Sequence, residues 1–126
     1  MSKPDDDAQI FIFGAQIPDF WWEVRVPIPT DHDYRTARLD MLFAPVDQAE
    51  LDRMRGIGLA KDEQPLSDAD IARRVLRGWK LQDATGQAVP FGPERLDELL
   101  RAPIVRTAIV STYLAAMSGV AARKNG

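Results

Sequence analysis

The chain has 126 residues, of which 45% are hydrophobic, which is enough for one globular domain with a sizeable core and favours one domain over two. There are 16 lysines and arginines against 19 aspartates and glutamates, and the formal net charge of −3 argues against strong nucleic-acid binding. The lack of cysteine excludes disulfides, thiolate metal sites and a cysteine nucleophile.

The N-terminus is expected to be a mobile tail over residues 1–8, because it is polar and contains three consecutive aspartates. It is acidic where a signal peptide would be basic, and no uncharged apolar run of about 18 residues follows. The sequence therefore predicts a cytoplasmic protein without a membrane span. Residues 10–13 are apolar on both faces, which suits a covered strand or a contact segment.

An antiparallel β-hairpin is predicted over about residues 20–43, because apolar residues alternate with polar ones in both halves. The apolar set is Phe20, Trp22, Val24, Val26, Ile28, Ala37, Leu39, Met41 and Phe43. Residues 29–33 between the halves are rich in turn formers. Trp21 is the one large aromatic residue on the polar face, so it is either a contact residue or packed under the N-terminal segment.

Two helices are predicted next. Asp47 caps a short helix that Gly56 can end, and a polar loop over residues 59–66 follows. Ser67 caps a second helix, in which apolar residues recur every four positions and which is expected to end near Gly78.

A short second hairpin is predicted over about residues 79–91, because the apolar spacing changes from four to two at Trp79. Asp83 and Gly86 suit the first and last positions of a type I turn. Pro90 limits the return strand to a sheet edge.

Two further helices follow. Pro93 suits the first turn of an acidic, leucine-rich helix that should end before Pro103. The last helix, about residues 103–119, is apolar on nearly all sides, which fits either a central core helix or a surface completed by a partner. Arg106 interrupts its apolar run, which is too short for a membrane span.

The expected fold class is α+β, a mainly helical small domain with about four helices and two hairpins. The domain is expected to cover residues 9–120, with a frayed C-terminus at residues 121–126. Two domains are not expected, because the loop over residues 59–66 has none of the features of a domain boundary.

No catalytic, metal or cofactor site is predicted. His32 is the only histidine and lies in a turn between Asp31 and Asp33, where a solvated side chain is expected. Three adjacent residues do not supply a closed ligand set for a metal ion. Gly56 and Gly58 lack the preceding strand and the third glycine of a dinucleotide-binding loop. The sequence therefore predicts a protein that is not an enzyme.

Arg73, Arg74 and Arg77 give the second helix a basic side. Carboxylates at residues 94, 97 and 98 are available to neutralise it, which favours a solvated helix face. The alternative is a patch that binds an acidic partner helix or phosphates.

The packing and turn motifs occur in a definite order. A Ser-Asp-Ala-Asp start is followed by Val-Leu-x-Gly-Trp, Asp-x-x-Gly-x-x-Val-Pro-Phe, a leucine-rich helix, Pro-x-Val-Arg-x-Ala and Tyr-Leu-x-Ala-x-Ser-Gly. These pieces are residues 67–70, 75–79, 83–91, 96–100, 103–108 and 113–119, and the segment over residues 20–29 also matches. In this order and spacing, over roughly residues 20–119, the chain resembles the tail assembly chaperones of long-tailed bacteriophages.

The resemblance implies a function without an active site. Such chaperones bind the tape measure protein, a long helical chain that sets tail length, keep it soluble and help to recruit tail tube subunits. They act in the host cytoplasm and are not part of the mature virion. The alternative is a structural tail component, a completion or tube-associated protein, that acts by self-assembly.

The resemblance also implies an extended form, made when a minority of ribosomes shift frame near the end of the gene, whose extra domain contacts the tail tube protein. Lys124 and Asn125 can be encoded by a run of adenines followed by cytosine, on which ribosomes slip. A gene with no slippery heptamer at or just upstream of codons 123–125 would exclude this hypothesis.

The predicted partners are the tape measure protein, the tail tube protein through the extended form, and further copies of the chain in a homo-oligomer. No nucleic acid, membrane or cofactor is predicted. The predicted partner-binding residues lie on the hairpin and the last helix and are Trp21, Trp22, Ile104, Ala108, Ile109, Tyr113 and Met117.

Overall fold

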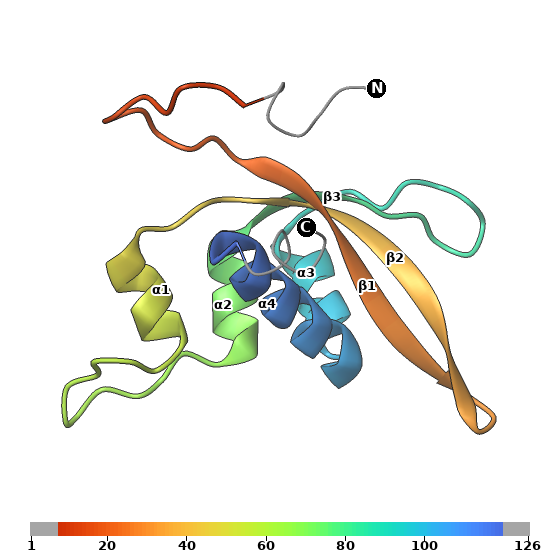
Figure 1. Ribbon diagram of the computed structural model, residues 1–126. Helices are drawn as coiled ribbons and strands as arrows, with labels where there is room; N and C mark the ends of the chain where they lie inside the picture. The colour runs from red at the N-terminus through yellow and green to blue at the C-terminus, as the bar shows by residue number, and fades with distance from the viewer. Residues whose placement is uncertain (1–7, 120–126) are drawn as a thin grey trace.

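The computed structural model describes residues 8–119, so the predicted mobile tail, except for its last residue, and the predicted frayed end lie outside the described residues. Three strands and four helices make an α+β domain (Figure 1), which confirms the expected fold class. The elements are β1 (Phe20–Thr30), β2 (Asp33–Phe43), α1 (Gln48–Met54), α2 (Asp68–Val75), β3 (Leu76–Lys80), α3 (Pro93–Leu100) and α4 (Pro103–Met117).

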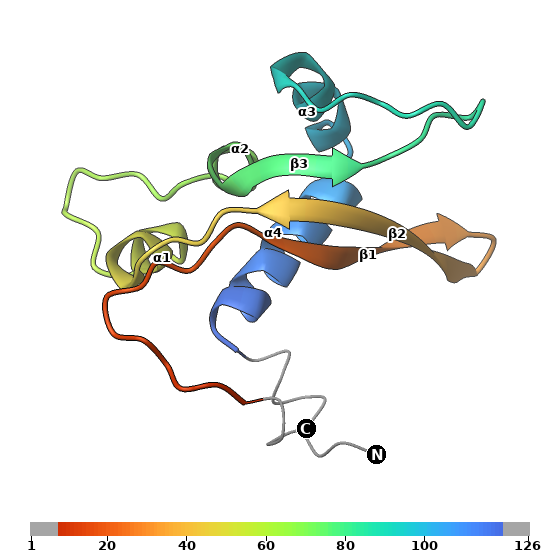
Figure 2. The same cartoon turned by 90° about the horizontal axis from the view of Figure 1, so that it is seen from above.

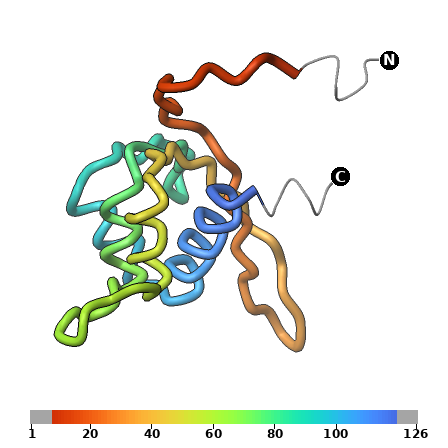
Figure 3. The backbone as a smooth tube through the Cα atoms, turned by 60° about the vertical axis from the view of Figure 1, so that its left-hand side comes forward, coloured from red at the N-terminus to blue at the C-terminus, as the bar shows by residue number. Residues whose placement is uncertain are grey.

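The sheet is antiparallel throughout, with the strand order β1-β2-β3. β1 and β2 pair over their full length, from Phe20 opposite Phe43 to Thr30 opposite Asp33, which confirms the predicted hairpin. Only two residues connect the strands, and one of them, His32, has a left-handed backbone with φ of +64°. The hairpin tip extends beyond the helices (Figures 1 and 3).

The helices lie on one face of the sheet, and the opposite face of β1 and β2 is not covered by any helix of the described chain (Figures 1 and 2). The core forms between the two layers, because alternate strand residues point toward the helices. α4 crosses beneath β1 and also packs on α2 and α3. The fully buried large side chains are Tyr113, Phe43, Met41, Ile71, Ile109, Val24, Val26 and Val75.

The helix starts confirm the predicted caps. The Asp47 carboxylate accepts from the Glu50 N–H at 2.9 Å, and the Ser67 hydroxyl accepts from the Asp70 N–H at 3.1 Å. Such caps satisfy donors that the first turn of a helix leaves unpaired. Pro93 starts α3 as predicted.

The predicted end of the second helix was wrong. α2 ends at Val75, and β3 begins at Leu76, two residues before Gly78. Pairing with β2 explains the change, because it places Trp79 opposite Met41 and satisfies backbone groups that a longer helix would have used internally. Trp79 thus belongs to the main sheet.

The predicted second hairpin is reduced to a turn and one bridge. The Gly86 N–H donates to the Asp83 carbonyl at 3.0 Å, so the predicted turn is present. Beyond it, the two arms of the turn form a single isolated bridge, between Gln82 and Ala88. The return arm reaches Pro90 directly after Val89, and proline has no N–H to donate to a neighbouring strand, so the pairing does not continue.

Residues 10–13 are not a covered strand. Ile10 and Phe13 are 92% and 98% exposed, and the segment has no strand structure. The other interpretation, a contact segment, stays a prediction.

Candidate functional site

Trp21 and Trp22 stand at the start of β1 and point to opposite faces of the sheet, because consecutive strand residues alternate. Trp21 lies on the outer face and is 48% exposed, so it is not buried under the N-terminal segment. The ammonium of Lys80 lies 4.5 Å from the centre of its ring, a cation–π distance. Trp21 is therefore held in place while half of its surface stays accessible.

Trp22 lies on the inner face and is 38% exposed. Its ring meets Phe20 edge-on, with 6.1 Å between ring centres, and Phe20 stacks on Tyr113 at 6.4 Å. Tyr113 in turn contacts Phe43 at 5.2 Å. Trp22 is thus the exposed end of an aromatic cluster anchored in the core.

The predicted contact residues on α4 divide into two groups. Ala108, Ile109 and Tyr113 belong to the core, with 8%, 0% and 0% of their surfaces exposed, so they cannot form a contact surface in this fold. They are buried because α4 is the core helix of the domain. A central core helix was the first of the two alternatives predicted for this segment; the other was a surface completed by a partner. Ile104 and Met117 are partly buried against the core.

Most of the exposed large hydrophobic residues of the described chain lie before and at the start of β1. Of the ten exposed large hydrophobic residues in the described chain, seven fall within residues 10–22, which we call the N-terminal apolar stretch. They are Ile10, Phe11, Ile12, Phe13, Ile17, Trp21 and Trp22. The sequence pointed to residues 10–13 and both tryptophans, but not to Ile17, which stands alone among polar and small residues.

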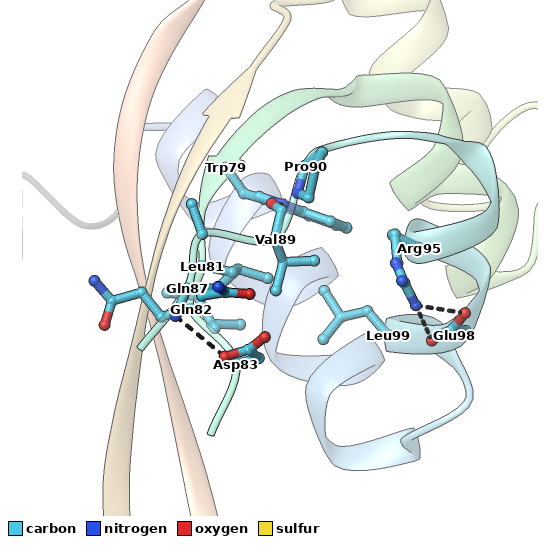
Figure 4. Close-up of a pocket in the computed structure, with 12 residues that line it drawn as sticks. Trp79, Leu81, Gln82, Asp83, Gln87, Val89, Pro90, Arg95, Glu98 and Leu99 are labelled. Atoms are coloured by element: carbon cyan, nitrogen blue, oxygen red, sulfur yellow. Dashed lines mark hydrogen bonds and ion pairs between the residues drawn. The ribbon is translucent and has the colours of Figure 1, made fainter. Parts of the chain in front are cut away.

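A separate open groove of about 720 Å³ lies between β3, α3 and the turn segment (Figure 4). The Trp79 indole N–H donates to the Val89 carbonyl at 2.8 Å across it. Arg95 donates to Glu98 at 3.1 and 3.2 Å, so these two polar groups satisfy each other. This arrangement holds the turn segment against the domain.

Asp83 at the rim of the groove organises the turn. Its carboxylate accepts from the Thr85 hydroxyl and N–H and from the Gln87 N–H at 3.1 Å. Hydrogen bonds from Thr85 are the main cause that lowers the pKa of Asp83. The role of Asp83 is therefore local.

Two of the three arginines expected on the basic side of α2 are neutralised within the chain, whereas Arg77 lies in β3 and makes no ion pair among the described residues. Arg73 pairs with Asp97 at 3.0 Å and with Asp70 at 3.3 Å, and Arg74 pairs with Glu50. These contacts favour the solvated helix face over an anion-binding patch. Of the predicted neutralising carboxylates, Asp97 is used, whereas Glu98 pairs with Arg95.

Within residues 8–119 no group of three or more histidine, aspartate or glutamate side chains is placed to hold a metal ion. No single helix in that range is long and apolar enough to cross a membrane; α3 and α4 reach the required length only together, with a 106° bend between them. No protein-family model, curated protein or solved structure that we compared with the chain matches it. The N-terminal apolar stretch is the candidate functional site, because seven of the ten exposed large hydrophobic residues of the described chain lie in it.

Proposed function

We propose that the protein is a tail assembly chaperone of a long-tailed bacteriophage, which binds the tape measure protein and keeps it soluble in the host cytoplasm. The observation that carries the proposal is the N-terminal apolar stretch, in which seven large side chains are 38% to 98% exposed. We infer that the client binds where these exposed large apolar side chains concentrate, because exposed apolar patches mark protein–protein contact sites. The order of motifs over residues 20–119 supports the choice of this family.

The chaperone acts by binding and not by catalysis. A long amphipathic client exposes apolar stripes before the tail tube closes around it, and such stripes aggregate unless they are covered. Phe11, Phe13 and Trp22 offer the aromatic surface that packs against such helices. Moderate affinity per domain is sufficient, because several copies bound along one client act together.

We extend the proposal to the longer form expected from a frameshift near the end of the gene. Its additional domain recruits tail tube subunits while the common domain holds the client. Neither form remains in the mature virion.

Affinity purification from cells that also express the neighbouring genes tests the proposal. We expect mass spectrometry to find a long helical client together with a longer protein that shares the N-terminal peptides of this chain. Recovery of the short chain alone, or in mature tails, would contradict the proposal and favour the structural tail component.

A double substitution, Phe11→Ser with Phe13→Ser, tests the surface itself. The two side chains are 79% and 98% exposed, so their loss should leave the fold intact. Loss of two apolar contacts should weaken client binding about tenfold or more. Ile57→Ser is the matched control, because Ile57 is 54% exposed but lies in the loop after α1. Equal weakening by the control would show that the stretch is not the binding site.

A further inference from the structure

The outer face of β1 and β2 carries cross-strand pairs in a distinctive order. The register places Trp21 opposite Leu42, Glu23 opposite Asp40, Arg25 opposite Arg38 and Pro27 opposite Thr36. Glu23 is half-buried, Leu42 is partly buried, and the other six are exposed. Along the strands, the face therefore presents an apolar row, then an acidic row, then a basic row, and last a weakly polar row formed by Pro27 and Thr36.

The two charged rows place like charges directly opposite each other, which is unfavourable in an isolated sheet. Part of this repulsion is relieved within the chain, since Arg25 contacts Glu23 at 2.8 Å and Lys80 is opposite Asp40 in the register. Arg38 makes no ion pair among the described residues. A partner that carries the rows in reverse order would neutralise both.

We propose that this partner is a second copy of the chain, docked sheet against sheet on the outer face. A twofold axis that runs across the strands, level with Val24 and Leu39, reverses the row order. It brings each acidic pair over the basic pair of the other copy, and Trp21 over the Pro27 row. Aligned sheets pack about 10 Å apart with strands within about 30° of each other, which long charged side chains and a tryptophan can span.

The same patch serves both copies, as a twofold interface requires. Asp40 of each copy pairs with Arg38 of the other, and Glu23 with Arg25. Because about eight residues per copy take part, the interface is smaller than a standard one of about 800 Å² per partner, and the dimer is weak and sensitive to salt. This dimer goes beyond the chaperone activity and does not depend on it.

Sedimentation over a range of protein concentrations tests the dimer. The average mass should rise from 14.1 kDa toward twice that value at low salt and fall back when salt is added. A chain that stays monomeric up to about 1 mM, the weak end of specific affinities, would overturn the proposal. Dimerisation only after removal of residues 1–14 would also overturn it, because the chain's own N-terminal segment would then occupy the face.

Charge reversal provides a sharper test. R38E places two carboxylates against each other in the dimer, and D40R places two guanidinium groups there, so each variant alone should associate at least about tenfold more weakly. An equal mixture of the two should recover the native association, because every contact then joins opposite charges. The double variant R38E/D40R should also dimerise. Failure of the mixture to associate, with both variants folded by circular dichroism, would overturn the twofold arrangement.

R35E is the matched control. Arg35 is an exposed arginine of β2, but it pairs with Ile28 and so lies on the opposite face of the sheet from Arg38. The same change of charge there should leave self-association within about twofold of native, since distant exposed charges are screened. If R35E disrupts the dimer as strongly as R38E, association reflects net charge and the proposed interface is wrong.

Discussion

The hydroxyl of Tyr113 donates a hydrogen bond to the backbone carbonyl of Ala44 at 2.7 Å, which ties α4 to the residue that follows β2. The N–H of Ala44 donates to the Val75 carbonyl at 2.7 Å, at the junction of α2 and β3. Tyr113 has no exposed surface, and Ala44 is 8% exposed, so water cannot easily replace either bond. Residue 44 therefore joins the end of β2 and the junction of α2 and β3 to the core helix.

Tyr113→Phe should lower the free energy of unfolding by about 1–3 kcal/mol, because it leaves a buried carbonyl without its donor. Urea denaturation measures the loss. Tyr34→Phe is the matched control: Tyr34 is 65% exposed, so the change should stay within about 0.5 kcal/mol. Equal effects of the two substitutions would show that the Ala44 contact does not stabilise the fold.

Stability should also decline at high pH through Tyr113. Burial raises the pKa of Tyr113 from its ordinary value of 10.0 to about 12, although the positive charge of Arg77 opposes the rise. The folded state thus holds the phenol proton more tightly than the unfolded state. This stabilising contribution is complete below pH 10 and is lost as pH rises from about 10 to 12.

We expect the loss to be on the order of 2 kcal/mol in a Tyr34→Phe background, where only one tyrosine remains to titrate. Urea denaturation at pH values across this range, with tyrosinate absorbance recorded in parallel, measures it. The double variant with Tyr113→Phe should lack this part of the decline. The same slope in both proteins would assign the alkaline loss to other groups.

Trp79→Phe should loosen the turn segment. It removes the indole donor to the Val89 carbonyl at 2.8 Å, while a ring remains to pack edge-on against Phe91. Amide exchange at Val89, whose N–H donates to Leu81 at 2.9 Å, should accelerate by about fivefold or more, the equivalent of a net hydrogen bond of about 1 kcal/mol. Trp22→Phe, at a half-exposed ring, should leave that exchange rate unchanged. Unchanged exchange in Trp79→Phe would mean that the turn is held by other contacts.

Local signals in the sequence predicted most of the fold. The caps at Asp47 and Ser67 and the starting prolines act within one helical turn, so the residues themselves determine them. The end of α2 was different, because Leu76 and Trp79 fit either a helix or a strand. The outcome there depends on pairing with β2, which lies more than 30 residues earlier in the chain. A pattern read from residues 67–80 alone does not include this partner.

The candidate site was predictable only in part, for the same physical reason. Alternation along β1 correctly placed Trp21 outside the core. On α4, apolar residues cover nearly every side, so the sequence does not tell which side the sheet will cover, and Ile109 proved to be fully buried. Ile17 was missed because exposure of an isolated apolar residue depends on whether neighbouring elements reach it.

The substitution Trp21→Ser tests whether Trp21 is a contact residue or a core residue. The side chain is 48% exposed, so its removal should lower stability by only about 0.5–1 kcal/mol, mainly through the lost cation–π contact with Lys80. Client binding should weaken about tenfold, because tryptophans in contact surfaces contribute disproportionately to affinity. Both quantities should be measured at protein concentrations low enough to keep the chain monomeric.

Tyr34→Ser, at an exposed aromatic near the hairpin tip, is the control for loss of any aromatic surface and should leave client binding unchanged. A large loss of thermal stability in Trp21→Ser, in step with the loss of binding, would instead make Trp21 part of the core, and the client would then bind through the rest of the N-terminal apolar stretch.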